Sequence, residues 1–230
     1  MKAMILAAGK GERMQPLTLT RPKPLLPAAG KPLLEHWLQR LEAAGINEIV
    51  INVSYLGEQI EAYIKARGGT ANIVVIREGE PLETGGALFN ALPLLGDEPF
   101  LLINGDVFCE MDLHALVVRA EVPAVGAYLV LAANPAHNVT GDFVLSGNGI
   151  IKAKTQESIR GGGALTFSGL SVISPELIRQ YPNCRQKFPL REVFYWALEK
   201  QNIRGESYSG YWLDVGTPER LAELNDYLRE

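Results

Sequence analysis

Residues 3–18 read AMILAAGKGERMQPLT, an apolar run followed directly by a glycine-bearing, charged loop. An apolar run of strand type, Ala3 to Ala8, gives way at once to Gly9-Lys10-Gly11, then to Glu12-Arg13 and Pro16. A simple turn needs fewer special residues. Glycines let backbone N–H groups approach an anion closely, and an arginine offers a planar fork of donors to anionic oxygens. The stretch matches neither GxGxxG nor the Walker A pattern, so other segments must show what this loop holds.

The N-terminal half alternates between strand-type and helix-type patterns. Further apolar runs predict strands at Glu48 to Val53, Ile73 to Ile76 and Pro99 to Ile103. Apolar residues at helical spacing predict helices at Pro32 to Ala44, Gly57 to Arg67 and Gly85 to Leu95. Strands and helices that alternate in this way indicate βαβ units and a parallel sheet.

The pattern changes after about residue 120. Strands joined by short glycine-bearing turns are expected at Val125 to Ala132, Gly141 to Leu145, Gly149 to Ala153 and Ala164 to Ile173. Gly161 to Gly163 is interpreted as a flexible turn between two of them. Helical patterns return at Pro189 to Glu199 and Pro218 to Arg229. We therefore expect one α/β domain with a parallel N-terminal half and a mixed C-terminal half, in which some strands pair antiparallel.

The composition excludes several classes of protein. The chain has 230 residues, 47% hydrophobic and 21% charged, with a net charge of −4, so no general nucleic-acid or membrane surface is expected. Two cysteines make no disulfide framework, and no Cys/His pattern suggests zinc. The N-terminal apolar run is too short for a signal peptide, and no stretch approaches a membrane span. We expect a soluble cytoplasmic protein.

Three further segments place charged residues at special positions. Lys23 stands between Pro22 and Pro24, and two fixed φ angles suit a lysine that must point at one spot; the alternative is a proline-rich surface turn. Asp106 ends the apolar run LLING, a natural place for a carboxylate that binds Mg²⁺; the alternative is a turn or a helix N-cap. Asp214 ends a second short apolar stretch, YWLD.

No catalytic triad is apparent in the sequence. His36, His114 and His137 lie apart from the segments above, and His36 is interpreted as a packing or surface residue within a helix.

Together these segments resemble the sugar-1-phosphate nucleotidyltransferase family. Leu6 to Thr18 matches the family signature LAAGxGxRxxPLT at every specified position, and Pro22 to Pro27 matches its PKPLLP segment. Glu80 to Gly85 matches EPLxTxG, Asn104 to Asp106 matches the strand-end acid motif, and Trp212 to Pro218 matches WxDxGTP. The matches follow the family's order and cover nearly the whole chain.

The resemblance implies a Rossmann-like, mixed and mostly parallel sheet flanked by helices. It implies a single domain over residues 1–230, with a nucleotide-binding half at 1–120 and a sugar-phosphate-binding half at 121–230. The implied reaction joins an NTP and a sugar 1-phosphate to give an NDP-sugar and pyrophosphate, with Mg²⁺ as cofactor. The chain ends soon after Asp214, so no C-terminal β-helix domain is expected. A monomer or small homo-oligomer without nucleic-acid or membrane partners is expected.

The resemblance also implies roles for individual residues. The implied catalytic residues are Arg13, which binds the leaving phosphates, and Lys23, which contacts the reacting centre. The implied metal ligands are Asp106 and Asp214. The implied nucleotide contacts are Ala8, Gly9, Gly11, Glu12, Arg13, Lys23, Glu78, Glu80, Glu83, Gly85 and Asn104. The implied sugar contacts are Gly141 and Glu157.

Two departures bear on these expectations. Gln15 stands where many relatives carry a basic residue, a position that varies. The family's frequent Glu-Lys-Pro segment, which holds the sugar and its phosphate, has no counterpart; the region reads IKAKTQE, residues 151–157. Glu157, Lys152 or Lys154 are the candidates to replace it.

Within the family, EGEPLETGGAL, NGDVF and TFSGLSV are most similar to uridylyltransferases that act on N-acetylmuramate 1-phosphate in bacterial cell-wall recycling. We therefore expect UTP and that sugar phosphate as substrates. The alternatives are a mannose- or heptose-1-phosphate guanylyltransferase, then a glucose-1-phosphate thymidylyl- or uridylyltransferase. Two other classes are a metal-dependent glycosyltransferase, which would release no pyrophosphate, and a non-catalytic nucleotide sensor.

Overall fold

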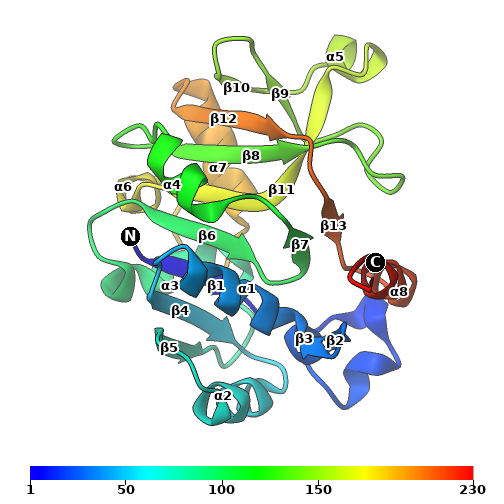
Figure 1. Cartoon of the computed structure of the whole chain (residues 1–230). Helices are drawn as coiled ribbons and strands as arrows, with labels where there is room; N and C mark the ends of the chain where they lie inside the picture. Colours follow the sequence, from blue (N-terminus) through cyan, green and yellow to red (C-terminus); the bar gives the residue numbers. More distant parts are fainter. Residues whose placement is uncertain (230) are drawn as a thin grey trace.

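The computed structural model describes residues 1–229, and its centre is a nine-stranded sheet (Figure 1). Four parallel strands form the N-terminal part in the order β5-β4-β1-β6. Their bounds are Ala3–Leu6 for β1, Glu48–Val53 for β4, Asn72–Arg77 for β5 and Phe100–Asn104 for β6. Because the strands are parallel, their carboxyl ends meet at one edge of the sheet.

The C-terminal part of the sheet is mixed. Strand β11 (Ala164–Ile173) runs antiparallel to β6, and pairs also with β8 (Ala127–Ala132) and β9 (Phe143–Leu145). Strand β10 (Ile151–Ala153) pairs antiparallel with β9, and β12 (Ile203–Tyr208) runs parallel to β8. The predicted fold class and the antiparallel pairing are confirmed. Strand β12 escaped prediction because IRGESY is not an apolar run.

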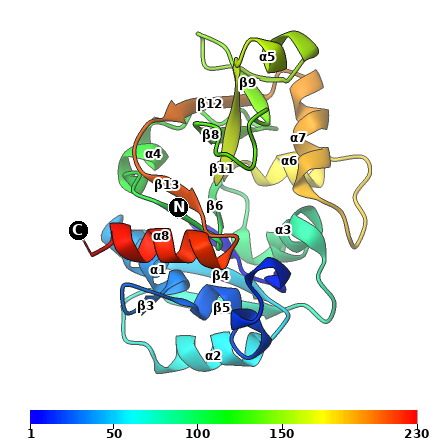
Figure 2. The same ribbon diagram turned by 90° about the vertical axis from the view of Figure 1, so that its right-hand side faces the viewer.

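Helices cover both faces of the sheet (Figure 2). In β1, Met4 faces one hydrophobic cluster while Ala3 and Ile5 face the other, so both faces are buried, as expected of parallel strands. The first cluster includes residues of α3 (Glu83–Leu95), α6 (Pro175–Arg179) and α7 (Leu190–Glu199). The second includes residues of α1 (Leu33–Ala43), α2 (Gly57–Ala66) and α4 (Leu113–Arg119).

The C-terminal helix α8 (Pro218–Tyr227) packs against the N-terminal segment. A third cluster joins α8 to residues before α1, among them Met14 and Leu26. Asn225 accepts a hydrogen bond from the Ala29 N–H at 2.9 Å, on a hairpin of β2 (Pro27–Ala28) and β3 (Lys31–Pro32). Figure 1 shows α8 beside this hairpin. The two ends of the chain therefore build one side of the molecule together.

Shorter elements complete the structure. Three 3-10 helices, η1 to η3, span Glu12–Met14, Leu17–Leu19 and Lys23–Leu25. Strands β7 (Val107–Cys109) and β13 (Trp212–Asp214) form a small antiparallel sheet. Helix α5 (Gln156–Arg160), capped by Thr155, comes directly before Gly161 to Gly163. That segment was wrongly predicted to join two strands; it follows a helix instead, because Thr155 and Ser158 form a capping box.

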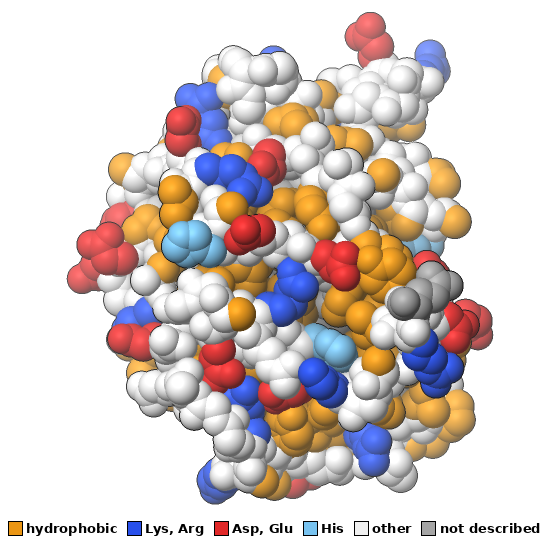
Figure 3. All heavy atoms as spheres, viewed as in Figure 1, with side chains coloured by type: hydrophobic (Ala, Val, Ile, Leu, Met, Phe, Trp, Pro, Cys, Tyr) orange, Lys and Arg blue, Asp and Glu red, His pale blue; other side chains and the backbone are white. Residues whose placement is uncertain are grey.

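Two properties of the surface bear on possible partners. No helix within residues 1–229 is both long and apolar enough to cross a bilayer. On the face drawn in Figure 3, acidic and basic side chains are interspersed, without one broad basic patch among the described residues.

A buried cluster of ion pairs fastens α1 to the end of α2. Arg67 donates to Glu35 at 3.0 Å and to Glu42 at 3.1 Å, and its side chain is only 8% exposed. Burial alone raises the pKa of Glu35, but hydrogen bonds from Arg67 and Tyr63 outweigh it, so the pKa is lowered. The pKa of Glu42 is lowered chiefly by its hydrogen bond from Arg67.

Replacing Arg67 by methionine is expected to lower the free energy of unfolding at pH 7 by about 3 kcal/mol, since two buried carboxylates lose their partner. Urea titration measures this. The matched control is Arg77→Met, which breaks the more exposed pair with Glu61 and should cost less than about 1 kcal/mol. Equal losses in the two variants would contradict this account of the cluster.

The cluster also predicts how stability varies with pH. The folded-state pKa values of Glu35 and Glu42 lie below the ordinary 4.5, so their stabilisation is present above that pH. It is lost as the pH falls below 4.5 through the folded-state values. Urea titrations between pH 5 and pH 3 should therefore show a steeper loss of stability in the wild type than in Arg67→Met, and parallel curves would argue against it.

Candidate active site

A cavity of about 500 Å³ opens where the four parallel strands end. Polar or glycine residues stand at or just after the carboxyl end of each strand: Gly9 after β1, Asn52 in β4, Glu78 after β5 and Asn104 in β6. Such an edge is where open α/β sheets bind ligands. The predicted site residues that line it are Ala8, Gly9, Gly11, Glu12, Arg13, Lys23, Glu78, Glu83, Asn104 and Asp106.

The opening loop is shaped by Gly11 and Thr18. Gly11 has φ +64°, in the left-handed region, and a Cβ there would lie 3.2 Å from the Cβ of Lys23. The buried Thr18 hydroxyl donates to the Gly11 carbonyl at 2.8 Å. The loop and the lysine segment are therefore in direct contact, as the sequence motifs suggested.

Lys23 is paired with Asp106. The Lys23 ammonium lies 2.9 Å from the Asp106 carboxylate, and the two side chains are 10% and 42% exposed. Gly105 allows β6 to end against β1, since its N–H donates to the Leu6 carbonyl and a Cβ would lie 2.6 Å from that oxygen. A buried lysine thus meets a carboxylate that still faces solvent at the mouth of the cavity.

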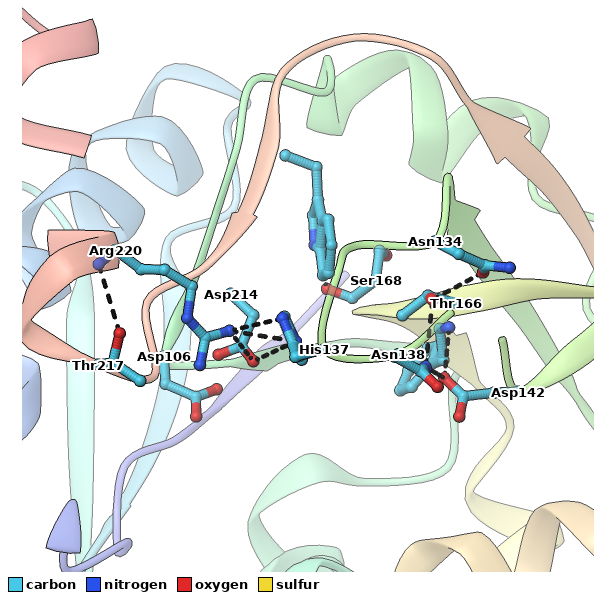
Figure 4. A network of polar contacts seen from close by, with 12 residues as sticks. Asp106, Asn134, His137, Asn138, Asp142, Thr166, Ser168, Asp214, Thr217 and Arg220 are labelled. Atoms are coloured by element: carbon cyan, nitrogen blue, oxygen red, sulfur yellow. Dashed lines mark hydrogen bonds and ion pairs between the residues drawn. The ribbon is translucent and has the colours of Figure 1, made fainter. Parts of the chain in front are cut away.

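Asp214 approaches Asp106 from the small sheet of β7 and β13. It lies opposite Val107 in the strand register, and the Val215 N–H donates to the Asp106 carbonyl at 2.8 Å. Figure 4 shows the two carboxylates beside each other, with Arg220 and His137 on the Asp214 side. Asp106 and Asp214, more than a hundred positions apart in the sequence, are therefore neighbours in the folded protein.

Arg220 and His137 hold the Asp214 side chain. The Arg220 guanidinium donates to Asp214 Oδ2 at 2.8 Å, and His137 Nε2 lies 3.2 Å from the same oxygen. The expectation that His137 lies apart from the motifs is wrong, because the chain between β8 and β9 folds back over β13. His36 is a packing residue as expected, with a ring nitrogen 2.9 Å from the Ala28 carbonyl and its ring edge against Phe108.

Gly216 is the point on which three charged groups converge. A Cβ there would lie 2.5 Å from Arg220 Nη2 and 3.0 Å from both Arg13 Nη2 and Asp214 Oδ1. Gly216 lines the cavity together with Arg13. The guanidinium groups of Arg13 and Arg220 therefore lie at the end of the cavity next to Asp106 and Asp214. Their positive charge makes this end suited to an anion.

The donor set around Asp106 and Asp214 fits a hard cation that keeps other ligands of its own. Among residues 1–229, no group of three or more His, Cys, Asp and Glu side chains is arranged to hold a metal. Two neighbouring carboxylates without a closed ligand cage match Mg²⁺, which is usually bound by one or two carboxylates plus substrate phosphates and water.

The other end of the cavity carries Glu78, which is 5% exposed. Its carboxylate accepts hydrogen bonds from Asn52 Nδ2 at 2.8 Å and from the Leu82 N–H at 3.0 Å. Glu80 is exposed and does not line the cavity. Gly85 does not line it either, because its N–H donates to the Phe188 carbonyl at 2.9 Å and a Cβ would strike the Phe188 ring.

The two predicted sugar contacts also lie outside the cavity lining. Glu157 is an exposed residue in the first turn of α5. Gly141 has φ +60°, and a Cβ there would lie 2.8 Å from the backbone of Ala164, so packing alone accounts for this glycine. Lys154 donates to the Gly141 carbonyl and to Thr140 Oγ1 at 3.1 Å, which ties the two segments together.

A second polar network lies next to His137 in Figure 4. Asn138 donates to Asp142 at 3.2 Å and to Thr166 at 3.1 Å, and Thr166 donates to Asn134 at 2.9 Å. His137 contacts Asp214, and the next residue, Asn138, belongs to this network. The network is therefore connected through the backbone to the group around Asp214. The network belongs to the C-terminal half, where the sequence motifs gave the least guidance.

Sequence reasoning missed Asn52, Arg220, Gly216 and His137. A signal existed for Asn52, a polar residue near the end of the apolar strand EIVINV, and for Gly216 within the WxDxGTP match. Arg220 occupies an ordinary helix position, and His137 a loop far from any motif. Nothing local distinguishes either, since both acquire their partner only through folding.

Substituting Gly216 by alanine is expected to displace Arg13 and Arg220, the movable ends of two long side chains, while the fold survives. Binding of tripolyphosphate, measured by calorimetry, should weaken about tenfold or more, because charge-assisted hydrogen bonds contribute about 1.5–3 kcal/mol. Gly147→Ala is the control, since a Cβ there meets no atom within 4 Å. Unchanged affinity in Gly216→Ala would contradict the arrangement.

Comparison with known proteins agrees with this site. The family model described as nucleotidyl transferase matches residues 2–161. N-acetylmuramate alpha-1-phosphate uridylyltransferase of Neisseria meningitidis is 43% identical over 97% of this chain and 96% of that protein. The protein of the same name in Caulobacter vibrioides is 34% identical over 96% of this chain and 97% of its own.

Solved structures agree as well. HddC from Yersinia pseudotuberculosis, solved with GMP-PN, is 26% identical with a TM-score of 0.76 and covers 99% of both chains. A Bacillus anthracis protein solved in complex with sucrose has a TM-score of 0.84 at 21% identity and shares the fold over 100% of this chain and 96% of its own. On its sequence match, its relatives and its fold, the chain belongs to the nucleotidyl transferase family.

Proposed function

We propose that the protein transfers a uridylyl group from UTP to N-acetylmuramate 1-phosphate, giving UDP-N-acetylmuramate and pyrophosphate, with Mg²⁺ as cofactor. The observation that carries the proposal is the cavity in which Arg13, Lys23 and Asp106 meet at one edge of the sheet. The choice of substrates follows the names of the two relatives, of which one is 43% identical. Such an enzyme would serve cell-wall recycling, act in the cytoplasm and exist as a monomer or small homo-oligomer.

The residues of the site divide into two ends. Glu78 and Glu83 line the end assigned to the base, and Gly9, Gly11 and Arg13 line the end assigned to the triphosphate. The backbone amides of the opening loop and the Arg13 guanidinium bind phosphate oxygens. The β and γ phosphates then lie near Gly216, where Arg13 and Arg220 come together.

The chemical step needs positioning and charge neutralisation rather than a protein nucleophile. An oxygen of the sugar phosphate bonds to the α-phosphorus of UTP, and the bond from that phosphorus to the departing pyrophosphate breaks. Both reactants are anions, and Lys23 offsets their repulsion at the reacting centre. Arg13 stabilises the charge that develops on pyrophosphate. Held in this geometry, the reactants avoid much of the entropic cost of meeting in solution.

Asp106 and Asp214 would hold the Mg²⁺ ion in this proposal. Bound there, the ion supplies positive charge to the reacting phosphates and orients them. The hydrogen bond from Arg220 and the close approach of His137 fix the direction of the Asp214 carboxylate. Lys23 does the same for Asp106. The directions of both carboxylates are therefore set by neighbouring side chains.

A guanylyltransferase that acts on mannose 1-phosphate is the second candidate. The catalytic subunit beta of mannose-1-phosphate guanylyltransferase from Drosophila melanogaster is 31% identical over 94% of this chain and 60% of its own. A buried carboxylate such as Glu78 accepts hydrogen bonds from guanine as well as from uracil, so the site itself leaves both bases possible.

The test is a matrix of UTP, GTP, CTP, ATP and dTTP against N-acetylmuramate, mannose, heptose and glucose 1-phosphates, with Mg²⁺ present. Pyrophosphate release is measured, and the sugar product is identified by mass. The proposal expects the highest kcat/KM for UTP with N-acetylmuramate 1-phosphate. A preference for GTP with mannose 1-phosphate would replace it by the second candidate, and no pyrophosphate with any pair would refute both.

Replacing Lys23 by alanine or Asp106 by alanine should each lower kcat by about 100-fold, since one lost contact to the transition state costs on the order of 3 kcal/mol. Both variants should remain folded: Lys23→Ala should melt near the wild-type temperature, and Asp106→Ala at a lower one, because it leaves the Lys23 ammonium unpaired. Lys65→Ala and Asp97→Ala, both at exposed positions away from the cavity, are the matched controls. Wild-type rates in Lys23→Ala or Asp106→Ala would rule out the mechanism.

A further inference from the structure

Asn52 is a buried residue that lines the base end of the cavity beside Glu78. Its side chain sits near the carboxyl end of β4 and is 3% exposed. Asn52 Oδ1 accepts a hydrogen bond from the Ala7 N–H at 3.0 Å, and Asn52 Nδ2 donates to Glu78 Oε1 at 2.8 Å. The side chain therefore connects the opening loop after β1 with the acid that follows β5.

The hydrogen bonds that link Ala7, Asn52 and Glu78 fix the orientation of each of these groups. A backbone N–H can only donate, so the Ala7 N–H forces the oxygen of Asn52 toward itself and the NH₂ group toward Glu78. Glu78 must accept on that side. Its other oxygen, Oε2, accepts from the Leu82 N–H at 3.0 Å. With both oxygens anchored at a 5% exposed position, the Glu78 carboxylate cannot rotate freely.

We propose that Asn52 is a positioning residue, which holds the Glu78 carboxylate as a fixed acceptor for an N–H group of the nucleotide base. The inference rests on the proposed function, in which Glu78 lies at the base end of the cavity. Each carboxylate oxygen can accept more than one hydrogen bond, so Glu78 retains acceptor capacity toward the cavity that it lines. The imide N–H of uracil is a donor of the required kind.

Two other roles for Asn52 have to be separated from this one. One alternative is that Asn52 acts on the triphosphate instead of the base, since its hydrogen bond from Ala7 also joins it to the phosphate loop. The other is that it serves the fold alone, because a buried series of hydrogen bonds between two strands stabilises a sheet edge. The three roles predict different effects of changing Asn52: weaker binding of the base, weaker binding of the triphosphate, or lower stability alone.

The structure offers a pair of substitutions that exchanges the two groups. In Asn52→Asp, two carboxylates face each other in a buried place. In Glu78→Gln, the single amide oxygen cannot accept from both Asn52 and Leu82. In the double variant Asn52→Asp/Glu78→Gln, residue 52 accepts from Ala7 and from the new amide, whose oxygen accepts from Leu82. All three hydrogen bonds are restored, and the formal charge is unchanged, but residue 78 now offers the base a neutral amide with a single oxygen, which already accepts from Leu82, in place of a carboxylate.

Four proteins are compared with the wild type: the two single variants, the double variant and the matched control Asn72→Asp. Asn72 is an exposed residue at the opposite end of the neighbouring strand β5. For each we measure melting temperature, KM and kcat for UTP, and the inhibition constant of tripolyphosphate, which has no base. If a single variant does not fold, the double variant still carries the test.

The expected result separates binding of the base from stability. Asn52→Asp and Glu78→Gln should melt at lower temperature than the wild type and raise KM for UTP about tenfold, the effect of losing one hydrogen bond of about 1.4 kcal/mol, with kcat changed less than threefold. The double variant should regain the wild-type melting temperature but keep the raised KM. The inhibition constant of tripolyphosphate should stay unchanged throughout, and Asn72→Asp should match the wild type.

Three results would overturn the inference. Recovery of both KM and melting temperature in the double variant would mean that the chain serves the fold alone. A tripolyphosphate inhibition constant that rises together with KM in Asn52→Asp would assign Asn52 to the phosphate loop. Wild-type KM in Asn52→Asp would leave it no role in binding. If the wild type uses an NTP other than UTP, the proposed function fails, and the same comparison made with that NTP still tests Asn52.

Discussion

The ion pair between Lys23 and Asp106 is the interaction on which the site depends. It joins the loop after the first strand to the end of β6, across 83 positions of sequence, at 2.9 Å. A lysine whose side chain is only 10% exposed needs such a partner, because an unpaired buried ammonium is costly. The loop of Gly9 to Gly11, Asp214 and the guanidinium groups of Arg13 and Arg220 lie around this pair.

The parallel arrangement of the strands explains how a few elements supply all the residues of the cavity. Strands β1, β4, β5 and β6 end at one edge of the sheet, so each adds a residue to the same cavity without a long excursion of the chain. The small sheet of β7 and β13 and helix α8 then bring Asp214, Gly216 and Arg220 to that edge from the far end of the sequence. The C-terminal helix is therefore part of the site as well as of the core.

Much of this could be predicted from local sequence patterns. The apolar runs gave most strands within two residues, since both-faced burial makes parallel strands continuously apolar. The glycine, lysine and aspartate segments resembled a known family, and most of the residues expected to contact a nucleotide do line the cavity. Glu80 and Gly85 matched the same motif but point elsewhere, because one is exposed and the other packs on Phe188.

What escaped prediction depends on contacts between distant segments. Strand β12 carries glycine, glutamate and serine and is a strand only because β8 offers it a partner. His137 and Arg220 look ordinary in the sequence, yet both reach Asp214 once the chain is folded. The half expected to bind the sugar phosphate lacks the family's Glu-Lys-Pro segment, and its polar network of Asn138, Asp142 and Thr166 is apparent only in three dimensions.

In the proposed reaction, a sugar phosphate attacks the α-phosphorus of a nucleoside triphosphate held in this cavity. The most direct measurement uses N-acetylmuramate 1-phosphate labelled with ¹⁸O in its phosphate, with UTP and Mg²⁺, and follows the label by ³¹P NMR and mass spectrometry. The account predicts that all of the label enters the nucleotide sugar, including the oxygen that bridges its two phosphorus atoms, while the released pyrophosphate carries none. Label in the pyrophosphate, or release of inorganic phosphate without a nucleotide sugar, would contradict it.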